Sequence, residues 1–513
     1  MFSILPRAGR SVGSVFFPCS AAFPCRPGPA PLAVACLLVA FAVGQPAFAA
    51  DSAAAESPAD GPVLVYILSG QSNMVGIGQV DGGGVRWSSE FIEPVLSVYP
   101  GEYDAKADYD RLEPTTTLKL ERFGGVDPSP YPGGGVQVVR GRIRMPQRGV
   151  YEFRPGYGSS SENIMHVAGR EVHRKEPGGT ASSTPIKLEA EAEVPFRIIY
   201  LNSQANGLGW YARQDIPGTL TTVVKQEGRY PELLDADGNW ASRSDVWYKG
   251  VVTAGANKWL SVGCGASGGQ IGPELGFGWV MGDFHDRPVL VLKASQGNRS
   301  LGWDFLPPGS ERFEQTDDDG TTWIYAGYKD PAPRWEKGTQ PEKIDWYAGK
   351  QYDDCFNAAK EVLANFDENF PHWKGRGYEI AGFGWWQGHK DSGSDVHTAN
   401  YEKNLVQLIA ALRKDFNAPQ APFVVATIGF DGRAMEGNFL KIAEAQLAVD
   451  GVTGKHPEFA GTVKSVDTRD FWHPAEESPK NQGYHYNQNA ETYLNVGQAM
   501  GRGMRELLEG SRR

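Results

Sequence analysis

Segments with the patterns of strands and helices alternate along the second half of the chain. Short apolar runs typical of buried strands are followed by longer segments whose apolar residues recur on one helical face. Because parallel strands are joined through a crossover helix, this alternation predicts a three-layer α/β/α fold with a mainly parallel sheet. Ligands of such sheets bind beyond the carboxyl ends of the strands. The expected strands are 290–294, 378–385, 423–428 and 462–466, and the expected helices are 353–366, 398–416, 439–449 and 491–508.

An earlier strand ends in a tight turn that carries a serine. Val63 to Leu68 is an apolar run that includes β-branched residues, and Ser69 and Gly70 end it. Ser72 follows one residue past Gln71, where the chain must turn. A strand-to-helix turn can present a serine oxygen at the carboxyl end of a sheet, beside backbone amides that stabilise an oxyanion. We therefore predict that the Ser72 hydroxyl is a nucleophile.

Residues 104–211 have a different pattern, which predicts an inserted β-sandwich-like domain. Strand-like runs alternate with turn residues at near-regular spacing, and helical periodicity is weak. Parts of this pattern resemble the protective-antigen type of β-sandwich, a module often attached to carbohydrate-active enzymes. The alternative is a plain spacer without a ligand. The runs are 135–139, 149–153, 186–190 and 196–201, and the resemblance is carried by 141–143, Pro146, 149–153 and 166–172.

The first 49 residues have the features of a secretory signal. Arg7, Arg10 and Arg26 precede or flank an apolar stretch, and the sequence Ala-Phe-Ala at 47–49 fits a signal-peptidase site. The stretch is too short to favour a membrane-spanning helix. We therefore predict an exported protein, periplasmic or extracellular, with no membrane insertion after cleavage. The predicted organisation is a signal peptide at 1–49, a flexible linker at 50–61, an α/β domain at 62–103 and 212–513, and the inserted domain at 104–211.

Charge and cysteine content argue against several functions. Loss of the three arginines of the leader changes the formal net charge from −11 to −14, which disfavours binding to nucleic acid or to anionic membranes. Two cysteines remain, Cys264 and Cys355, which either form a disulfide or stay as free thiols. No His/Cys spacing is typical of a zinc site, and no glycine motif is typical of dinucleotide binding. We expect neither a metal nor a cofactor.

Four short motifs resemble those of the SGNH hydrolases. The similarity is to the branch that holds the sialate O-acetylesterases and carbohydrate esterase family six, and the motifs occur in the order found in that branch. The resemblance implies a flavodoxin-like α/β fold and hydrolysis of esters. The motifs are Gly70–Met74, Ile271–Gly278, Trp385–Asp391 and Tyr484–Asn487.

The resemblance also implies roles for particular residues. It makes Ser72 the nucleophile and His485, just before the last expected helix, the base that activates it. His389, in the third motif, is a second candidate for the base. For the oxyanion, the resemblance implies three donors: the backbone amides of Ser72 and Gly272 and the side-chain amide of Gln387.

The sequence departs from the SGNH pattern three residues before His485. Many of these enzymes carry an aspartate there, which orients the base, whereas this chain has Gln482. A neutral amide cannot stabilise an imidazolium as a carboxylate does. The alternatives are a carboxylate from elsewhere, a Ser–His dyad, or a backbone carbonyl that orients the ring. The candidate carboxylates are Asp470, Asp467 and Asp391.

Two further segments have open roles. Residues 296–303 follow an expected strand and are rich in polar groups, so they either line the substrate cleft or form a structural loop. Trp385 and Trp386 either belong to the core or include a platform for a sugar ring.

Together these features predict an exported serine esterase that removes O-acetyl groups from a carbohydrate. The expected substrate is an acetylated polysaccharide or a sialic-acid-type glycan, and the reaction passes through an acetyl-enzyme. The β insertion would dock polymeric glycan or shape the cleft. One alternative is an esterase that acts on other small acyl esters. Another is a surface carbohydrate-binding protein whose esterase centre has decayed.

Overall fold

The computed structural model describes most of the chain after the leader. The predicted signal peptide (1–49) and most of the predicted linker (50–61) lie outside the described residues. Within the described part, every helix is too short or too polar to traverse a lipid bilayer. The described residues are 61–82, 85–86, 90–121, 135–156, 162–176, 178–201 and 209–511.

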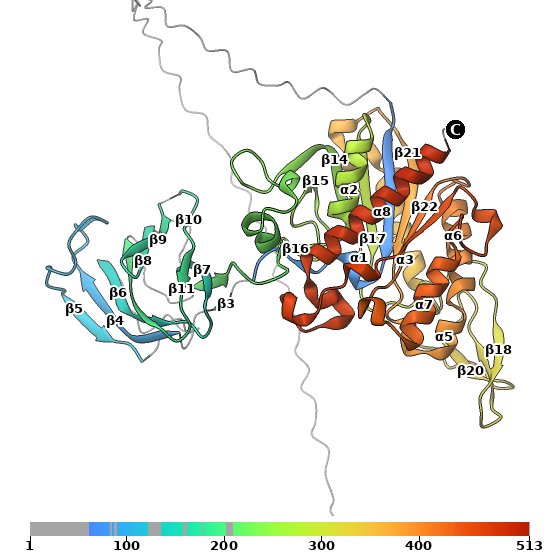
Figure 1. Ribbon diagram of the computed structural model, residues 1–513, viewed down its shortest axis with the longest axis horizontal. Coiled ribbons are helices and arrows are strands. Elements are labelled where there is room, and N and C mark those ends of the chain that lie inside the picture. Colours follow the sequence, from blue (N-terminus) through green and yellow to red (C-terminus); the bar gives the residue numbers. More distant parts are fainter. Residues whose placement is uncertain are drawn as a thin grey trace, which may run out of the picture. The chain divides into compact units, whose positions relative to one another are not determined.

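One seven-stranded sheet organises the α/β part of the chain (Figure 1). Its strands from β14 to β23 pair in parallel, and β15 adds an antiparallel edge. The alternation of strands and helices therefore gives the mixed α/β fold with a parallel sheet that the sequence predicts. The order across the sheet is β15 (Asn257–Ser261), β14 (Ser242–Val251), β17 (Val289–Ser295), β1 (Val63–Gly70), β21 (Tyr378–Trp386), β22 (Phe423–Ala426) and β23 (Val463–Val466).

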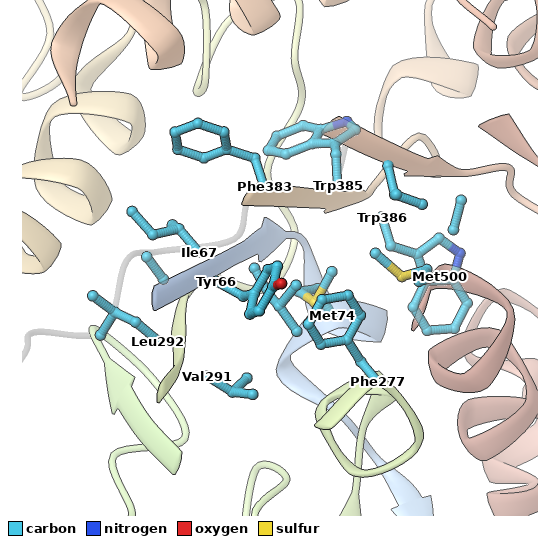
Figure 2. Close-up of a cluster of buried hydrophobic side chains, with 14 of the residues drawn as sticks. Tyr66, Ile67, Met74, Phe277, Val291, Leu292, Phe383, Trp385, Trp386 and Met500 are labelled. Atoms are coloured by element: carbon cyan, nitrogen blue, oxygen red, sulfur yellow. The ribbon is translucent and has the colours of Figure 1, made fainter. Parts of the chain in front are cut away.

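Helices cover both faces of this sheet. On one face, Phe277 of α2 packs edge-on against Tyr66 of β1, and α8 packs against α2 (Figure 2). On the other face, the indole of Trp385 donates to the hydroxyl of Tyr401 in α6. Helix α3 also packs against β17. The helices are α1 (Ser72–Val75), α2 (Pro273–Phe284), α3 (Lys350–Ala364), α4 (Phe366–Asn369), α5 (Asp395–Ala399), α6 (Tyr401–Asp415), α7 (Gly437–Ala448) and α8 (Ala490–Gly510).

Strand β1 lies in the middle of the sheet and is buried along its whole length. A central parallel strand is covered by helices on both faces, so its sequence is continuously apolar rather than alternating. This explains the run from Val63 to Leu68. The register of β1 with its neighbours sets Gly70 opposite both Ser295 of β17 and Trp386 of β21. Three chain segments therefore leave the sheet side by side at its carboxyl edge.

Two antiparallel sheets are formed by residues between Val85 and Arg213. Apolar side chains of both sheets, such as Ile198 and Phe153, belong to one hydrophobic core. Their strands extend beyond 104–211 at both ends, and an inserted β-sandwich-like domain stays our interpretation of them. One sheet has the order β10 (Ser182–Ser183), β9 (Arg170–Lys175), β8 (Glu162–Val167), β12 (Glu193–Leu201), β6 (Val136–Arg144), β4 (Phe91–Tyr99) and β5 (Thr116–Lys119). The other has the order β11 (Ile186–Leu188), β7 (Gly149–Arg154), β13 (Trp210–Arg213) and β3 (Val85–Arg86).

The described structure also contains two free cysteines and two small sheets. Cys264 and Cys355 are both buried and both free, so the structure favours the thiol alternative over the disulfide. The small sheets pair β2 (Gly78–Gln79) with β16 (Gln270–Ile271), and β19 (Thr322–Tyr325) with β18 (Phe313–Thr316) and β20 (Arg334–Glu336).

A substitution at Gly70 tests how closely the end of β1 approaches the backbone of β21. Its φ is +154°, and a Cβ atom there would overlap the carbonyl oxygen of Trp386. We expect Gly70→Ala to lower the free energy of unfolding by about 2 kcal/mol or more, measured by urea denaturation. Gly255→Ala is the matched control, because a Cβ at Gly255 meets no atom within 4 Å. Equal stability of the two variants would contradict this account.

Candidate active site

Three consecutive residues after β1 contact two other segments of the site. The Oε1 atom of Gln71 accepts from the backbone amides of Gly388 and Lys390, at 3.3 and 3.2 Å. The Nδ2 atom of Asn73 donates to the carbonyl of Tyr484 at 3.3 Å. Ser72 lies between them, half-buried, as the first residue of α1. The turn therefore holds the segments after β21 and before α8 around one hydroxyl group.

The structure brings Ser72 and His485 together. The Nε2 atom of His485 lies 2.9 Å from the Ser72 Oγ, although the two residues are 413 positions apart. This is the separation expected for a nucleophile and the base that takes its proton. The residue types and their geometry are those required for attack on an ester carbonyl.

Left-handed backbone follows directly after His485. Tyr486, Asn487 and Gln488 have φ values of +50°, +52° and +57°, a region that costs energy for residues other than glycine. Hydrogen bonds hold this conformation: the Tyr486 hydroxyl accepts from the Gly429 amide at 2.8 Å, and the Tyr493 hydroxyl donates to the carbonyl of His485 at 3.1 Å. The position of the imidazole is therefore imposed by its surroundings.

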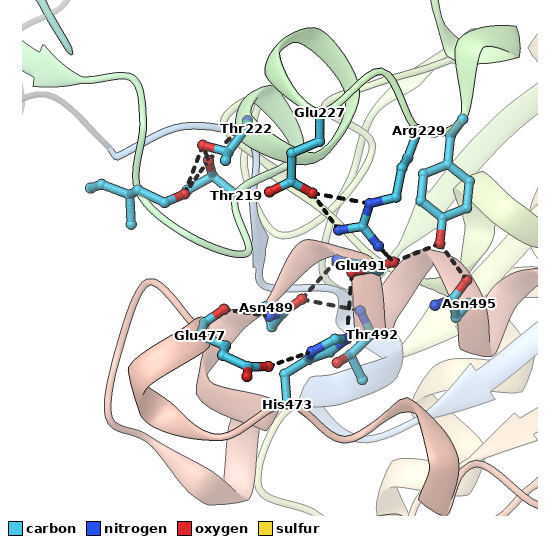
Figure 3. A network of polar contacts seen from close by, with 12 residues as sticks. Thr219, Thr222, Glu227, Arg229, His473, Glu477, Asn489, Glu491, Thr492 and Asn495 are labelled. Carbon is cyan, nitrogen blue, oxygen red and sulfur yellow. Dashed lines mark hydrogen bonds and ion pairs between the residues drawn. The ribbon is translucent and has the colours of Figure 1, made fainter. Parts of the chain in front are cut away.

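A polar network at the start of α8 supports the same segment (Figure 3). Asn489 caps the helix by accepting from the amides of Glu491 and Thr492, and its Nδ2 donates to the carbonyl of Glu477 at 3.1 Å. The carboxylate of Glu491 accepts from Arg229 and lies 3.5 Å from the Nε2 of His473. These contacts tie the chain on both sides of His485 to helix α8.

The second ring nitrogen of His485 is buried and has no hydrogen-bond partner among the described residues. Gln482, where an aspartate was expected, directs its side-chain nitrogen to the Tyr484 hydroxyl at 2.7 Å. Burial, and then the neighbouring His389, lower the pKa of His485 from 6.5 to about 4. The imidazole is therefore neutral at pH 7 and able to accept a proton.

The three candidate carboxylates have other partners. Asp467 accepts from Arg469 and Arg433, and Asp470 accepts from Arg433 on the protein surface. These ion pairs hold the pKa values of both carboxyl groups below their usual range. Neither is a hydrogen-bond partner of the His485 ring, so the structure supports the dyad alternative over a carboxylate supplied from this segment.

Asp391, the third candidate, organises a loop instead. Its carboxylate is fully buried and accepts from the amides of Leu301 and Gly302 at 2.9 and 2.8 Å, and from the Gln387 side chain at 2.6 Å. Burial raises the pKa of Asp391. The carboxylate therefore fixes the end of the 296–303 segment against the third motif.

The predicted oxyanion donors Gly272 and Gln387 are directed toward protein atoms. The amide of Gly272 donates to the Oε1 of Glu274 at 2.8 Å. The Nε2 of Gln387 is buried and lies 3.0 Å from the carbonyl oxygen of Arg299, in addition to its bond with Asp391. Gly272 is thus held by Glu274, and Gln387 joins the 296–303 segment to Asp391.

Gly297 is a site residue that the sequence left undecided. A Cβ atom at this position would lie 3.6 Å from the Cβ of Ser72. The backbone amides of Ser72 and Gly297 donate to no other residue within the described ranges. The segment 296–303 therefore reaches the nucleophile, and its polar composition after a strand was the available signal.

A buried ion pair lies beneath the nucleophile turn. The ammonium group of Lys293 donates to Glu274 at 2.7 Å and to the carbonyl of Val75 at 2.8 Å, and both charged side chains are fully buried. Glu274 in turn holds the amide of Gly272. The pair thus connects β17, the end of α1 and the start of α2.

The other aromatic and histidine candidates are packed side chains. The ring of His389 stacks against Phe439 and lies tilted against Tyr484, and the Ser72 hydroxyl is bonded to His485 instead. Trp385 and Trp386 are both almost completely buried, which assigns them to the core and removes them as sugar platforms. No cluster of three or more metal-binding side chains occurs in the described part of the chain.

Residues 333–504 match the family described as carbohydrate esterase, sialic acid-specific acetylesterase. The match includes the motif at 385–391 and His485, and it spans about a third of the chain. The chain is a carboxylic ester hydrolase. The resemblance to the sialate O-acetylesterase and carbohydrate esterase branch is thereby confirmed over this range. No curated protein sequence gives a significant match to the esterase.

Solved structures similar to the esterase include a protein from Arabidopsis thaliana, with 15% identity over 52% of this chain and 88% of that chain and a TM-score of 0.32. A carbohydrate acetylesterase from Xanthomonas citri has 9% identity over 73% of this chain and 72% of its own, with a TM-score of 0.33. A family two carbohydrate esterase from Cellvibrio japonicus has 9% identity over 84% and 99%, with a TM-score of 0.25. Because these TM-scores are below 0.5, the family assignment depends on residues 333–504.

The Lys293–Glu274 pair gives a stability prediction. Lys293→Met leaves a buried carboxylate without its counter-ion, so we expect the free energy of unfolding to fall by about 3–5 kcal/mol. The double variant Lys293→Met, Glu274→Gln removes both charges and keeps an acceptor for Gly272, and it should recover part of that loss. Urea denaturation measures both values. A single variant as stable as the unaltered protein would refute the role of the pair.

The pKa of His485 gives a prediction for pH dependence. A base with a pKa of about 4 stays neutral down to that pH, so kcat/KM for a small acetate ester should be nearly constant from pH 7 to pH 5. With a histidine of ordinary pKa, kcat/KM would fall about 25-fold between pH 7 and pH 5. Circular dichroism at each pH serves as the control for folding. A decline centred between pH 6 and 7 would contradict the lowered pKa.

Proposed function

We propose that the esterase removes O-acetyl groups from carbohydrates, with Ser72 as nucleophile and His485 as base. The observation that carries the proposal is the 2.9 Å separation of the Ser72 Oγ from the His485 Nε2. The family match at residues 333–504 supports the substrate class. An acetylated polysaccharide and a sialic-acid-type glycan are the two forms of substrate that this class includes.

In the proposed reaction, the Ser72 oxygen forms a bond to the acetyl carbonyl carbon while its proton passes to the Nε2 of His485. Collapse of the tetrahedral intermediate breaks the bond to the sugar oxygen, which takes the proton from His485. Water then attacks the acetyl-enzyme, and its proton passes to His485 and on to the Ser72 oxygen as acetate leaves. The imidazole ends each cycle neutral.

For the oxyanion we propose the backbone amides of Ser72 and Gly297 as donors. Both lie at the nucleophile and have no other acceptor within the described ranges, and preorganised donors of this kind contribute about 3 kcal/mol each. Gly272 and Gln387, the donors that the motifs imply, would first have to release Glu274 and Asp391. Their present contacts favour a role in holding the loops.

The proposed centre works as a dyad. A neutral base of low pKa is available at pH 7, but it provides less driving force for proton transfer than a base with a pKa near 7. Without a carboxylate, contacts to the backbone hold His485 beside the serine, and the Tyr493 hydroxyl, which lies between the Asn73 Oδ1 and the His485 carbonyl, is one of them. No metal or cofactor takes part in the steps that we propose.

Two further parts of the proposal rest on the sequence. The segment 1–49 supports export to the periplasm or the extracellular space. The two antiparallel sheets between Val85 and Arg213 are proposed to dock polymeric glycan or to shape access to the site. The net negative charge makes nucleic acid an unsuitable partner.

Release of acetate from a panel of acetylated glycans tests the proposed function. Ser72→Ala should reduce kcat/KM by at least about a thousandfold, because it removes the attacking atom. Ser182→Ala, which changes an exposed serine of β10, is the matched control and should keep full activity. Hydrolysis of longer acyl esters in preference to acetyl esters would favour the alternative substrate class. Unchanged acetate release by Ser72→Ala would overturn the proposal.

A further inference from the structure

Tyr484 is an exposed aromatic residue next to the candidate catalytic pair. Its side chain is 47% exposed, and its ring centroid lies 4.4 Å from that of His485. Trp385 and Trp386, the aromatic residues of the neighbouring motif, are buried and unavailable to a ligand. Tyr484 therefore exposes part of its aromatic side chain to solvent beside the candidate catalytic pair.

Hydrogen bonds fix the position of Tyr484 at both ends. Its carbonyl accepts from the Nδ2 of Asn73, and its hydroxyl accepts from the Nε2 of Gln482 at 2.7 Å. Gln482 is itself held by Gln488 at 2.7 Å, and Gln488 by Gln79 at 2.6 Å. A chain of three amide side chains thus anchors the phenol, and the member that contacts it, Gln482, occupies the position where an aspartate was expected.

The ring is also supported from one side. The imidazole of His389 lies 5.4 Å from the Tyr484 ring at an interplanar angle of 31°, and behind it the ring of Phe439 stacks on His389 at 5.9 Å. Burial lowers the pKa of His389, which disfavours a charged ring behind the tyrosine. A side chain ordered before binding loses little conformational entropy when a ligand packs against it.

We propose that Tyr484 is the platform for the sugar ring whose acetyl group reacts. This inference rests on the proposed function and names the residue that selects carbohydrate esters. An aromatic face packs against the C–H groups of a pyranose, and the hydroxyl bound to Gln482 keeps that face at a fixed angle beside His485. The contact lies on the leaving group, so it favours acetates of cyclic sugars over acetates of acyclic alcohols.

Kinetics with two acetate esters test the platform. The substrates are an acetylated pyranoside and ethyl acetate, which shares the acyl group and has no ring. We expect Tyr484→Ala to raise KM for the pyranoside by about tenfold and to change kcat/KM for ethyl acetate by less than about twofold. Tyr484→Phe keeps the ring and should retain most of the pyranoside activity. Tyr378→Ala is the matched control, because Tyr378 is 39% exposed and begins β21 at the end of the strand opposite to the site.

The outcomes separate the platform from the proposed function. Equal losses on both esters would mean that Tyr484 only positions His485, and this would overturn the platform. An unaltered KM for the pyranoside in Tyr484→Ala would overturn it as well. If the unaltered protein hydrolyses ethyl acetate but releases no acetate from any sugar, the proposed function fails and the platform fails with it.

Discussion

The register of three parallel strands is the constraint on which the rest of the structure depends. Pairing of β1 with β17 and β21 places Gly70, Ser295 and Trp386 at one edge of the sheet. The nucleophile turn, the segment 296–303 and the third motif all begin there. A shift of one residue in either pairing would turn every side chain of a strand to the opposite face. Because β1 is buried on both faces, the close packing of its side chains, rather than their polarity, opposes such a shift.

Buried polar side chains then join the segments that leave this edge. Gln71, Asn73 and Asp391 each bind backbone groups of a segment distant in sequence, and each is buried. Buried polar groups are costly unless they are paired, so these contacts are specific as well as stabilising. The buried Nδ1 of His485, in contrast, has no hydrogen-bond partner among the described residues. Burial, and then the neighbouring His389, lower the pKa of this imidazole to about 4.

The sequence predicted the elements of the α/β part well, because each has a strong local pattern. The apolar run at 63–68, the helix at 491–508 and the strands between them occur close to their expected ranges. Strand β14 was not predicted, since it carries several polar residues between its apolar positions. The expected bounds 104–211 were narrower than the antiparallel sheets, because β3 and β4 precede residue 104 and β13 extends to Arg213.

The sequence alone determined the alternation of strands and helices, the serine turn and the family motifs with their two histidines. Each of these features can be identified from residues that lie close together in the sequence. Only the tertiary structure decided which groups meet: His485 at Ser72, Gly297 against the same serine, and Gly272 and Gln387 turned toward Glu274 and Asp391. The physical reason is that hydrogen-bond partners at this edge come from segments separated by up to several hundred residues, and their choice follows from sheet register and burial, which no local pattern records.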